Sequence, residues 1–258
     1  MNIDKILSGY SNTCSIFSLK DDSVTFIRKA EYLKLLESTS LNILLIIPFF
    51  INDNDLKNLP VNVTPFRVPD NIEYYFTLFH NEIMKNVDPI PDEISTKSSI
   101  HSSAIIGVDG RKYVTCPDGT KLQMKHCGNV IIEDDVIIDP IVVIHRSSMS
   151  STIIKKGAKI CTGVNIGHNV IVGENTVICP GCLIGGTCII GKNVFIGQGV
   201  IVRDHRNICD NSEIGQGSNI LNDIDVPGTY VGNPAKFIKK YSVSLKPYDK
   251  RRLENGSI

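Results

Sequence analysis

An aliphatic residue returns at every sixth position through much of the second half of the chain. The positions in this register are Ile154, Ile160, Ile166, Val172, Ile178, Ile184, Ile190, Ile196, Val202, Ile208, Ile214 and Ile220. The residue four positions later is small or β-branched in most copies, as at Ala158, Val164 and Cys182. A strict period of six fits neither a helix of 3.6 residues per turn nor the two-residue alternation of a hairpin. It predicts a solenoid with one short strand and one turn per hexapeptide.

Three such hexapeptides make one triangular coil of 18 residues, and coils stack about one strand separation, roughly 4.8 Å, apart. The register begins at Ile94, breaks after Gly107 and resumes at Ile132. The pattern resembles the hexapeptide signature of left-handed parallel β-helices, and the left hand is implied by this resemblance alone. We therefore expect an all-β solenoid over residues 94–225, with an inserted loop or hairpin at 108–129.

Residues 1–93 do not share the register and predict a small N-terminal α/β domain. Short β-like runs cover Thr13–Leu19, Ser23–Ile27 and Asn42–Phe50, and helical patterns cover Lys29–Leu36 and Asn71–Met84. Pro89 and Pro91 mark the boundary with the solenoid. We expect residues 226–258 to form a C-terminal cap and tail, because the exposed strand edges of a solenoid end need covering.

Charge and apolar content exclude several classes of partner. Lys+Arg and Asp+Glu both number 27, so no basic surface for nucleic acid or anionic membrane is indicated. The longest apolar run, Ile43–Ile51, contains Pro48 and is too short to span a bilayer, and we expect a cytoplasmic protein. Cys179 and Cys182 form a CxxC, but Cys182 and Cys188 occupy the small buried position of the repeat, which favours structural thiols.

Two of the six histidines fall on the same corner of the predicted solenoid. His168 follows Ile166 by two residues and His205 follows Val202 by three, with Gly186 between them, so the three lie on successive coils. The histidines are expected roughly 10 Å apart at one strand spacing per coil. A neutral imidazole can accept a proton near pH 7, and an unobstructed glycine N–H can donate to an oxyanion. This arrangement suits acyl transfer from a thioester to an amine without a metal ion.

Three segments resemble one enzyme family. GHNVIVGENT, IGQGVIVRDHRNICD and VTFIRKAEY are similar to motifs of the UDP-3-O-acylglucosamine N-acyltransferases of lipid A synthesis and of smaller relatives that acylate nucleotide-linked amino sugars. The resemblance implies that His168 is the general base, that Gly186 N–H binds the oxyanion and that His205 lies near the pantetheine of the donor. The fold analogy implies a homotrimer.

In the N-terminal domain the resemblance implies a nucleotide-binding site. Phe26 and Tyr32 match the two aromatic residues that hold the base, and Lys29 stands where the family has asparagine, which leaves uracil and thymine open. The aromatic GFGY of the family is replaced by Arg111-Lys112-Tyr113-Val114.

The C-terminal part favours one branch of this family. VGNPAK resembles the ending of smaller sugar acetyltransferases that use coenzyme A, and a long helical extension for acyl carrier protein is missing. We therefore expect an N-acyltransferase that moves an acyl group from acyl-CoA to a dTDP- or UDP-linked amino sugar for lipopolysaccharide or capsule synthesis, with no bound cofactor. The alternative is the UDP-3-O-(3-hydroxyacyl)glucosamine N-acyltransferase of lipid A synthesis, which uses acyl carrier protein.

Two further classes compete with these interpretations. A γ-type carbonic anhydrase needs three histidines that converge on zinc, two of them close in sequence, and the closest pair here is His126 and His145. A non-catalytic solenoid scaffold would leave the alignment of His168 and His205 unexplained. A scaffold would transfer no acyl group from any thioester, whereas the enzyme would, so an acyl-transfer assay distinguishes the two classes.

Overall fold

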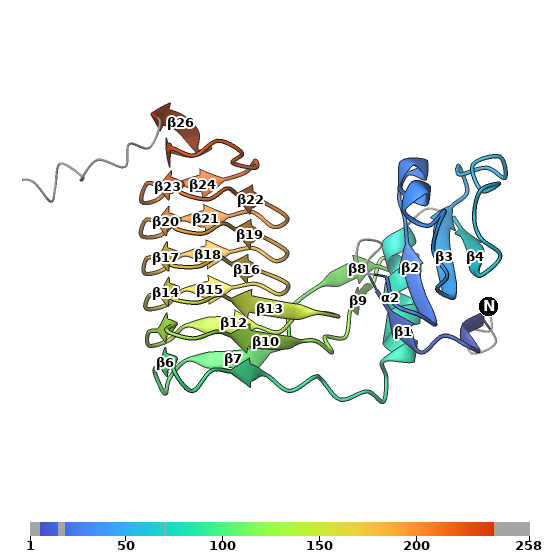
Figure 1. The fold of residues 1–258 in the computed structure, drawn as a ribbon, viewed down its shortest axis with the longest axis horizontal. Helices are drawn as coiled ribbons and strands as arrows, with labels where there is room; N and C mark the ends of the chain where they lie inside the picture. The colour runs from blue at the N-terminus through green and yellow to red at the C-terminus, as the bar shows by residue number, and fades with distance from the viewer. Residues whose placement is uncertain (1–5, 15–18, 70, 240–258) are drawn as a thin grey trace, which may run out of the picture. The chain divides into compact units, whose positions relative to one another are not determined.

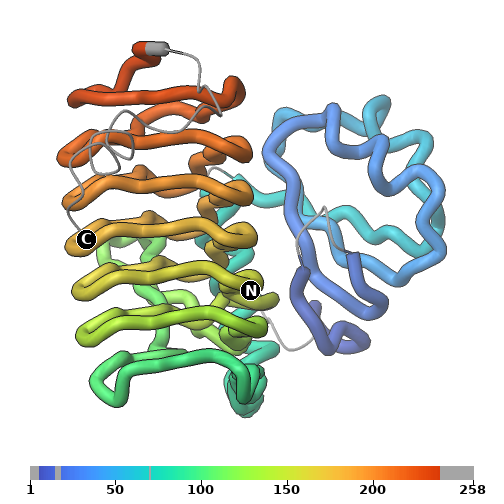
Figure 2. Tube along the Cα trace, turned by 60° about the vertical axis from the view of Figure 1, so that its left-hand side comes forward, coloured from blue at the N-terminus to red at the C-terminus, as the bar shows by residue number. Residues whose placement is uncertain are grey.

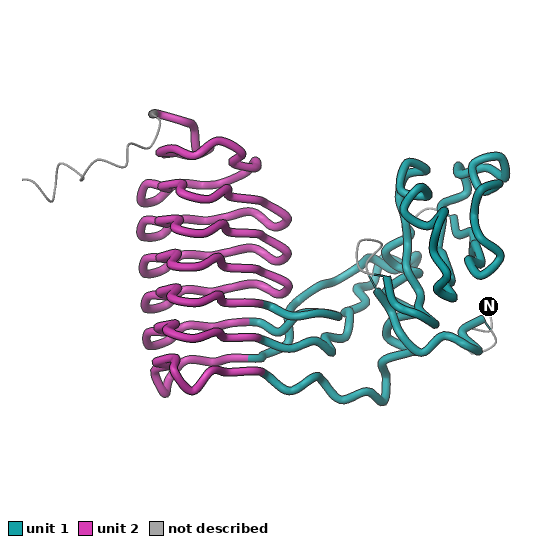
Figure 3. The backbone as a smooth tube through the Cα atoms, in the orientation of Figure 1, with its two compact units in different colours: residues 1–92, 107–130, 145–152 teal, residues 93–106, 131–144, 153–258 magenta. Residues whose placement is uncertain are grey.

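A computed structural model describes residues 6–14, 19–69 and 71–239 of the chain. These residues form two compact units, which Figure 3 colours separately. One unit takes the described residues within 1–92, 107–130 and 145–152, and the other takes those within 93–106, 131–144 and 153–258. The insertion that interrupts the hexapeptide register is therefore part of the same unit as the N-terminal residues. The tail predicted at the C-terminus lies outside the described residues from 240 onward.

The second unit is a solenoid with three faces, each a sheet whose neighbouring strands come from successive coils (Figures 1 and 2). The first face contains β5 (Glu93–Ile94), β10 (Asn129–Ile132), β13 (Ser151–Ile154), β16 (Ile171–Val172), β19 (Ile189–Ile190) and β22 (Asn207–Ile208). The second contains β6 (Ser99–Ile100), β11 (Ile137–Ile138), β14 (Lys159–Ile160), β17 (Val177–Ile178), β20 (Phe195–Ile196), β23 (Glu213–Ile214), β25 (Thr229–Val231) and β26 (Lys236–Lys239). The third contains β7 (Ile105–Val108), β12 (Val143–His145), β15 (Asn165–Ile166), β18 (Leu183–Ile184), β21 (Ile201–Val202) and β24 (Asn219–Ile220).

The pairing register follows the sequence repeat. On the third face Ile166 pairs with Ile184 and Ile184 with Val202, in parallel. All three side chains are buried, because the second residue of each two-residue strand points into the prism. Cys182 and Cys188 are fully buried and fill the small position beside these aliphatic residues, as predicted. Burial raises the pKa of each of these two thiols to about 11, so they stay protonated near neutral pH.

The corners between faces need residues that tolerate the left-handed region. Asn175, Asn193 and Asn211 hold φ of 54°, 54° and 58° at equivalent corners, and glycine takes that position at several others. Asparagine adopts this conformation more readily than other residues with a Cβ because its short amide bonds locally. The turn chemistry therefore recurs with the same period as the aliphatic residues.

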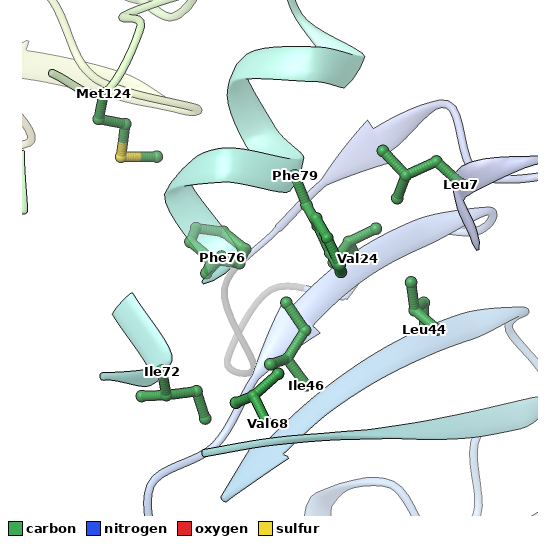
Figure 4. Packing of buried hydrophobic residues seen from close by; sticks show 9 residues of the cluster. All are labelled: Leu7, Val24, Leu44, Ile46, Val68, Ile72, Phe76, Phe79 and Met124. Carbon is green, nitrogen blue, oxygen red and sulfur yellow. The ribbon is translucent and has the colours of Figure 1, made fainter. Parts of the chain in front are cut away.

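The first unit is a parallel sheet with one long helix. Its sheet has the order β1 (Asn12–Thr13), β2 (Ser23–Phe26), β3 (Ile43–Pro48) and β4 (Val63–Val68). The helix α2 (Ile72–Ile83) places Ile72, Phe76 and Phe79 against Val24 and Ile46 of the sheet (Figure 4). A second buried cluster, which includes Ile27 and Leu45, contains no residue of the first.

Several local predictions for this unit need correction. The helical pattern at Lys29–Leu36 forms a 3-10 helix, η1 (Ala30–Leu35), rather than an α-helix. The run at Thr13–Leu19 contributes only β1, and residues 15–18 lie outside the described residues. Strand β4 was not predicted because Pro65 interrupts its pattern, and the strand tolerates Pro65 because it lies at the edge of the sheet.

The insertion forms a hairpin that binds α2. Its strands β8 (Tyr113–Thr115) and β9 (Lys121–Gln123) pair antiparallel. Asn71, the N-cap of α2, donates from Nδ2 to the Thr115 carbonyl at 2.5 Å, and Asn81 Nδ2 donates to the Gln123 carbonyl at 2.8 Å. Hydrogen bonds at both ends of the helix thus fix the hairpin on the first unit. Among the described residues no helix is long and apolar enough to cross a membrane.

Acidification should destabilise the first unit through His80, which is fully buried on α2. His80 Nε2 donates to the Lys125 carbonyl at 2.9 Å, and Nδ1 lies 2.6 Å from Thr13 Oγ1. Burial lowers the pKa of His80 from 6.5 to about 4, against the opposing effect of the bond to Lys125. Between these two pH values the unfolded chain binds more protons, so the stabilisation is complete above about pH 6.5 and is lost as the pH falls towards 4. We expect a loss of about 3 kcal/mol over this window.

Urea unfolding at pH 7 and pH 4.5 measures this loss in the free energy of unfolding. Hydrogen exchange of the α2 amides monitors the unfolding of this unit. His80→Asn should show a much smaller change between the two pH values than the wild type. His101→Ala, which removes an exposed histidine of the solenoid, should keep the wild-type change. Equal pH dependence in His80→Asn and wild type would contradict the assignment.

Candidate active site

His168 and Gly186 occupy the same corner position on successive coils, after β15 and β18 respectively. A Cβ built on Gly186 would lie 2.8 Å from His168 Nε2 and 2.9 Å from Cε1. The imidazole therefore lies against the bare Cα of Gly186, and no larger residue fits there without moving the ring. The backbone joins the two corners, since Thr187 N donates to the His168 carbonyl at 2.8 Å.

Asn169 fixes the orientation of this imidazole. Its backbone is left-handed, with φ of 62°, and its Oδ1 lies 2.7 Å from His168 Nδ1. An amide oxygen only accepts hydrogen bonds, so Nδ1 carries the proton and Nε2 keeps its lone pair. The basic nitrogen is thus the one next to Gly186. This role of Asn169 was not predicted from the sequence, although asparagine directly follows the histidine in the motif.

The N–H of Gly186 has no hydrogen-bond acceptor in the described part of the chain. At the equivalent corner position, Lys156 N donates to Glu133 Oε2 and Lys192 N to Asp210 Oδ1, both at 2.8 Å. Gly167 leaves space beside the Gly186 N–H, because a Cβ at Gly167 would lie 2.6 Å from that nitrogen. Two other corners satisfy this donor with a carboxylate, whereas the corner beside His168 leaves it available to a ligand.

His205 is tied to the same corner through its backbone. Its N donates to the Gly186 carbonyl at 2.9 Å, and its φ is 56°. Residues 18 apart stack on successive coils, so His205 lies above Thr187 and Asn169, whereas Asp204 lies above Gly186. The side chain of His205 is 64% exposed, with Nε2 3.8 Å from Asp204 Oδ2. The structure thus places His168, Gly186 and His205 on consecutive coils, while the expected spacing of the two imidazoles stays a prediction.

The residues expected to bind a nucleotide lie in the first unit. Phe26 ends β2 and packs against the cluster of α2, with its ring centroid 4.8 Å from that of Phe76. Tyr32, in η1, packs against the second cluster, around Leu33. Lys29 is exposed, and its Nζ lies 3.4 Å from Glu31 Oε1. Both aromatic residues therefore have a packing role, and their contact with a base stays a prediction.

Within the described residues, no group of three His, Cys, Asp or Glu side chains is arranged to hold a metal ion.

Sequence comparison finds relatives named UDP-3-O-acylglucosamine N-acyltransferase. The chain is 37% identical over 162 residues to the UDP-3-O-acylglucosamine N-acyltransferase of Rhizobium meliloti. This alignment covers 61% of this chain and 46% of that protein. It is 45% identical over 73 residues to the enzyme of the same name from Helicobacter hepaticus, covering 28% of this chain and 22% of that one. No family model matches the chain. The matched segments span less than half the length of these curated relatives.

Solved structures share the fold. The UDP-N-acetylglucosamine O-acyltransferase of Moraxella catarrhalis superposes with a TM-score of 0.51 at 25% identity, covering 63% of this chain and 60% of that one. The Arabidopsis UDP-N-acetylglucosamine acyltransferase has a TM-score of 0.53 at 20% identity, covering 66% and 55%. These matches confirm the left-handed parallel β-helix and the resemblance drawn from the sequence. The chain is thus similar in sequence to the UDP-3-O-acylglucosamine N-acyltransferases and has the fold of the hexapeptide-repeat acyltransferases.

Proposed function

We propose that the protein transfers an acyl group from a thioester to the amine of a nucleotide-linked amino sugar. The observation that carries this proposal is the corner where His168 Nε2 lies next to Gly186, whose N–H is unused within the described chain. A base and an oxyanion donor on adjacent coils are the two groups that aminolysis of a thioester needs. A scaffold would need neither the bare Gly186 nor the bond from Asn169 to the ring.

Each of these groups has a defined role in the reaction. The amine nitrogen attacks the thioester carbonyl, and His168 Nε2 takes the proton that the nitrogen loses. The carbonyl oxygen becomes an oxyanion that accepts a hydrogen bond from Gly186 N–H, and Asn169 Oδ1 holds the imidazolium through Nδ1–H. When the intermediate collapses, the C–S bond breaks and the thiolate leaves with the proton from His168. The products are an amide and a free thiol.

The comparisons favour one acceptor over our first interpretation. The relatives are named for UDP-3-O-acylglucosamine, which supports the alternative, a lipid A type acceptor, over other dTDP- or UDP-linked amino sugars. The proposal therefore takes a UDP-linked, 3-O-acylated glucosamine as acceptor. The donor is an acyl thioester of acyl carrier protein or coenzyme A, and the proposed assembly is the homotrimer of the fold analogy.

An assay of acceptors against donors tests the proposal. Purified protein is incubated with UDP-3-O-acylglucosamine or with other UDP- and dTDP-linked amino sugars, and with 3-hydroxyacyl carrier protein or short and long acyl-CoAs. Mass spectrometry then follows the amide product. We expect turnover with the UDP-linked acceptor. Folded protein that forms no amide in any combination would overturn the function and favour the scaffold.

Removing the His205 imidazole should raise the KM for the thioester donor up to about tenfold and leave kcat and the acceptor KM nearly unchanged. The His205 backbone bonds the Gly186 carbonyl and its imidazole is exposed, so we propose that the imidazole bonds the pantetheine arm, and one such bond contributes about 1 kcal/mol. The suitable variant is His205→Asn, because asparagine holds the same left-handed corner at position 169. Steady-state kinetics with each substrate varied in turn measures the effect. A fall in kcat at an unchanged donor KM would place His205 in proton transfer instead.

A further inference from the structure

Lys112 lies at the start of the hairpin that packs on α2, and its backbone is held firmly. Its carbonyl accepts a hydrogen bond of 2.9 Å from Met124 N, and the Met124 side chain is fully buried in the cluster with Phe76. Together with the bond from Asn71 to Thr115, this contact fixes Lys112 near the first turn of the helix. The hairpin and helix belong to the same compact unit.

The charged side chains described around Lys112 do not balance one another. Arg28 is ion-paired with Glu73 in the first turn of α2 and lies over the Phe26 ring, 5.9 Å from its centroid. Within the described chain, no carboxylate lies within 4.0 Å of Lys112 Nζ, and Glu73 forms its ion pair with Arg28. Burial lowers the pKa of Lys112, Glu73 opposes this shift, and the charge of Arg28 adds to it. The cluster of Arg28, Glu73 and Lys112 therefore carries one excess positive charge.

A lysine with only a structural role would avoid this position. Its flexible stem normally carries the ammonium into water or to a carboxylate, because a desolvated and unpaired charge destabilises the fold. Lys112 also differs from the family that the sequence resembles, because Arg111 and Lys112 stand where that family has an aromatic segment. Arg28 lies over the Phe26 ring and Lys112 adds a further positive charge to the same group of charged residues, which points to an anionic ligand there.

We propose that Lys112, with Arg28 beside it, binds the diphosphate of the nucleotide-linked acceptor next to Phe26. This inference rests on the proposed function for the identity of its ligand. A diphosphate supplies the negative charge that the cluster lacks, and the lysine ammonium meets it as a compact point charge with three donors. Phe26 lies at the same cluster, where it can contact the base of the same nucleotide.

Isothermal titration of uridine diphosphate, uridine and inorganic diphosphate into the full chain tests this site. Lys112→Met should weaken uridine diphosphate binding by roughly tenfold to a hundredfold, the effect of losing a charged hydrogen-bond partner. The binding of uridine should change less than twofold. Lys121→Met is the matched control, because Lys121 is an exposed lysine of the same hairpin, and it should bind like the wild type.

Stability separates a binding role from a structural one. Because Lys112 is partly desolvated and has no carboxylate within 4.0 Å among the described residues, Lys112→Met should unfold at the wild-type temperature or above it. Lys112→Arg should keep most of the affinity for uridine diphosphate. Unchanged binding in Lys112→Met, or a wild-type protein that binds no nucleoside diphosphate, would overturn the inference. If Lys112→Met weakens the binding of inorganic diphosphate as much as that of uridine diphosphate, the site binds the phosphates alone, and the inference is still supported. A wild type that binds uridine diphosphate but forms no amide would contradict only the proposed function.

Discussion

His168→Ala should lower kcat by about 10²- to 10⁴-fold while changing the KM of either substrate little. The attacking amine must lose a proton as the tetrahedral intermediate forms, and a positioned base contributes a factor of this size. His168 Nε2 is available for that proton because Asn169 Oδ1 accepts from Nδ1 at 2.7 Å. Steady-state amide formation, with both substrates varied, measures the change, and the loss should appear in kcat.

The control for this variant is His101→Ala. His101 is an exposed histidine of the same solenoid whose Nδ1 bonds Ser103 Oγ at 2.9 Å, so its loss should leave kcat within about twofold. A His168→Ala enzyme with near wild-type kcat would overturn the mechanism. The next histidine to test would then be His145, whose Nδ1 lies 3.0 Å from the Asp109 carbonyl.

The stacking of His168 on Gly186 could be predicted because a solenoid converts sequence spacing directly into position. Each coil contacts only its neighbours, so residues 18 apart in an unbroken register must lie one strand spacing from each other. The same arithmetic failed to specify details that depend on backbone dihedrals. It placed Asp204 after Gly186 and His205 one position further along, but the left-handed backbone of His205, with φ of 56°, came only from the structure.

The contacts of the first unit could not be predicted in this way. Arg28, Glu73 and Lys112 come from three separate segments, and only the docking of the hairpin on α2 brings their charges into the same cluster. No short-range pattern encodes such an approach. The unused N–H of Gly186 could likewise not be predicted, because carboxylates bond this donor at two equivalent corners, and the sequence does not show which corners they reach.

Gly186→Ala should lower kcat by about 10²-fold without unfolding the protein. The added Cβ would lie 2.8 Å from His168 Nε2, far inside normal contact, so the imidazole has to move or rotate. A displacement near 1 Å of a catalytic group costs about this factor. The backbone at Gly186 lies outside the left-handed region, so alanine can adopt it and the thermal unfolding midpoint should stay close to that of the wild type.

A double variant shows whether the effect passes through His168. If alanine at position 186 acts by displacing the imidazole, adding Gly186→Ala to His168→Ala should lower kcat little further, because the two changes remove the same interaction. Gly199→Asn is the matched control. Nothing lies within 4 Å of a Cβ added at Gly199, and the φ of 66° at this position suits asparagine, so activity should be retained. Wild-type kcat in Gly186→Ala would contradict the close contact. Fully multiplicative losses would instead assign the effect of Gly186→Ala to the oxyanion position and leave the imidazole undisturbed.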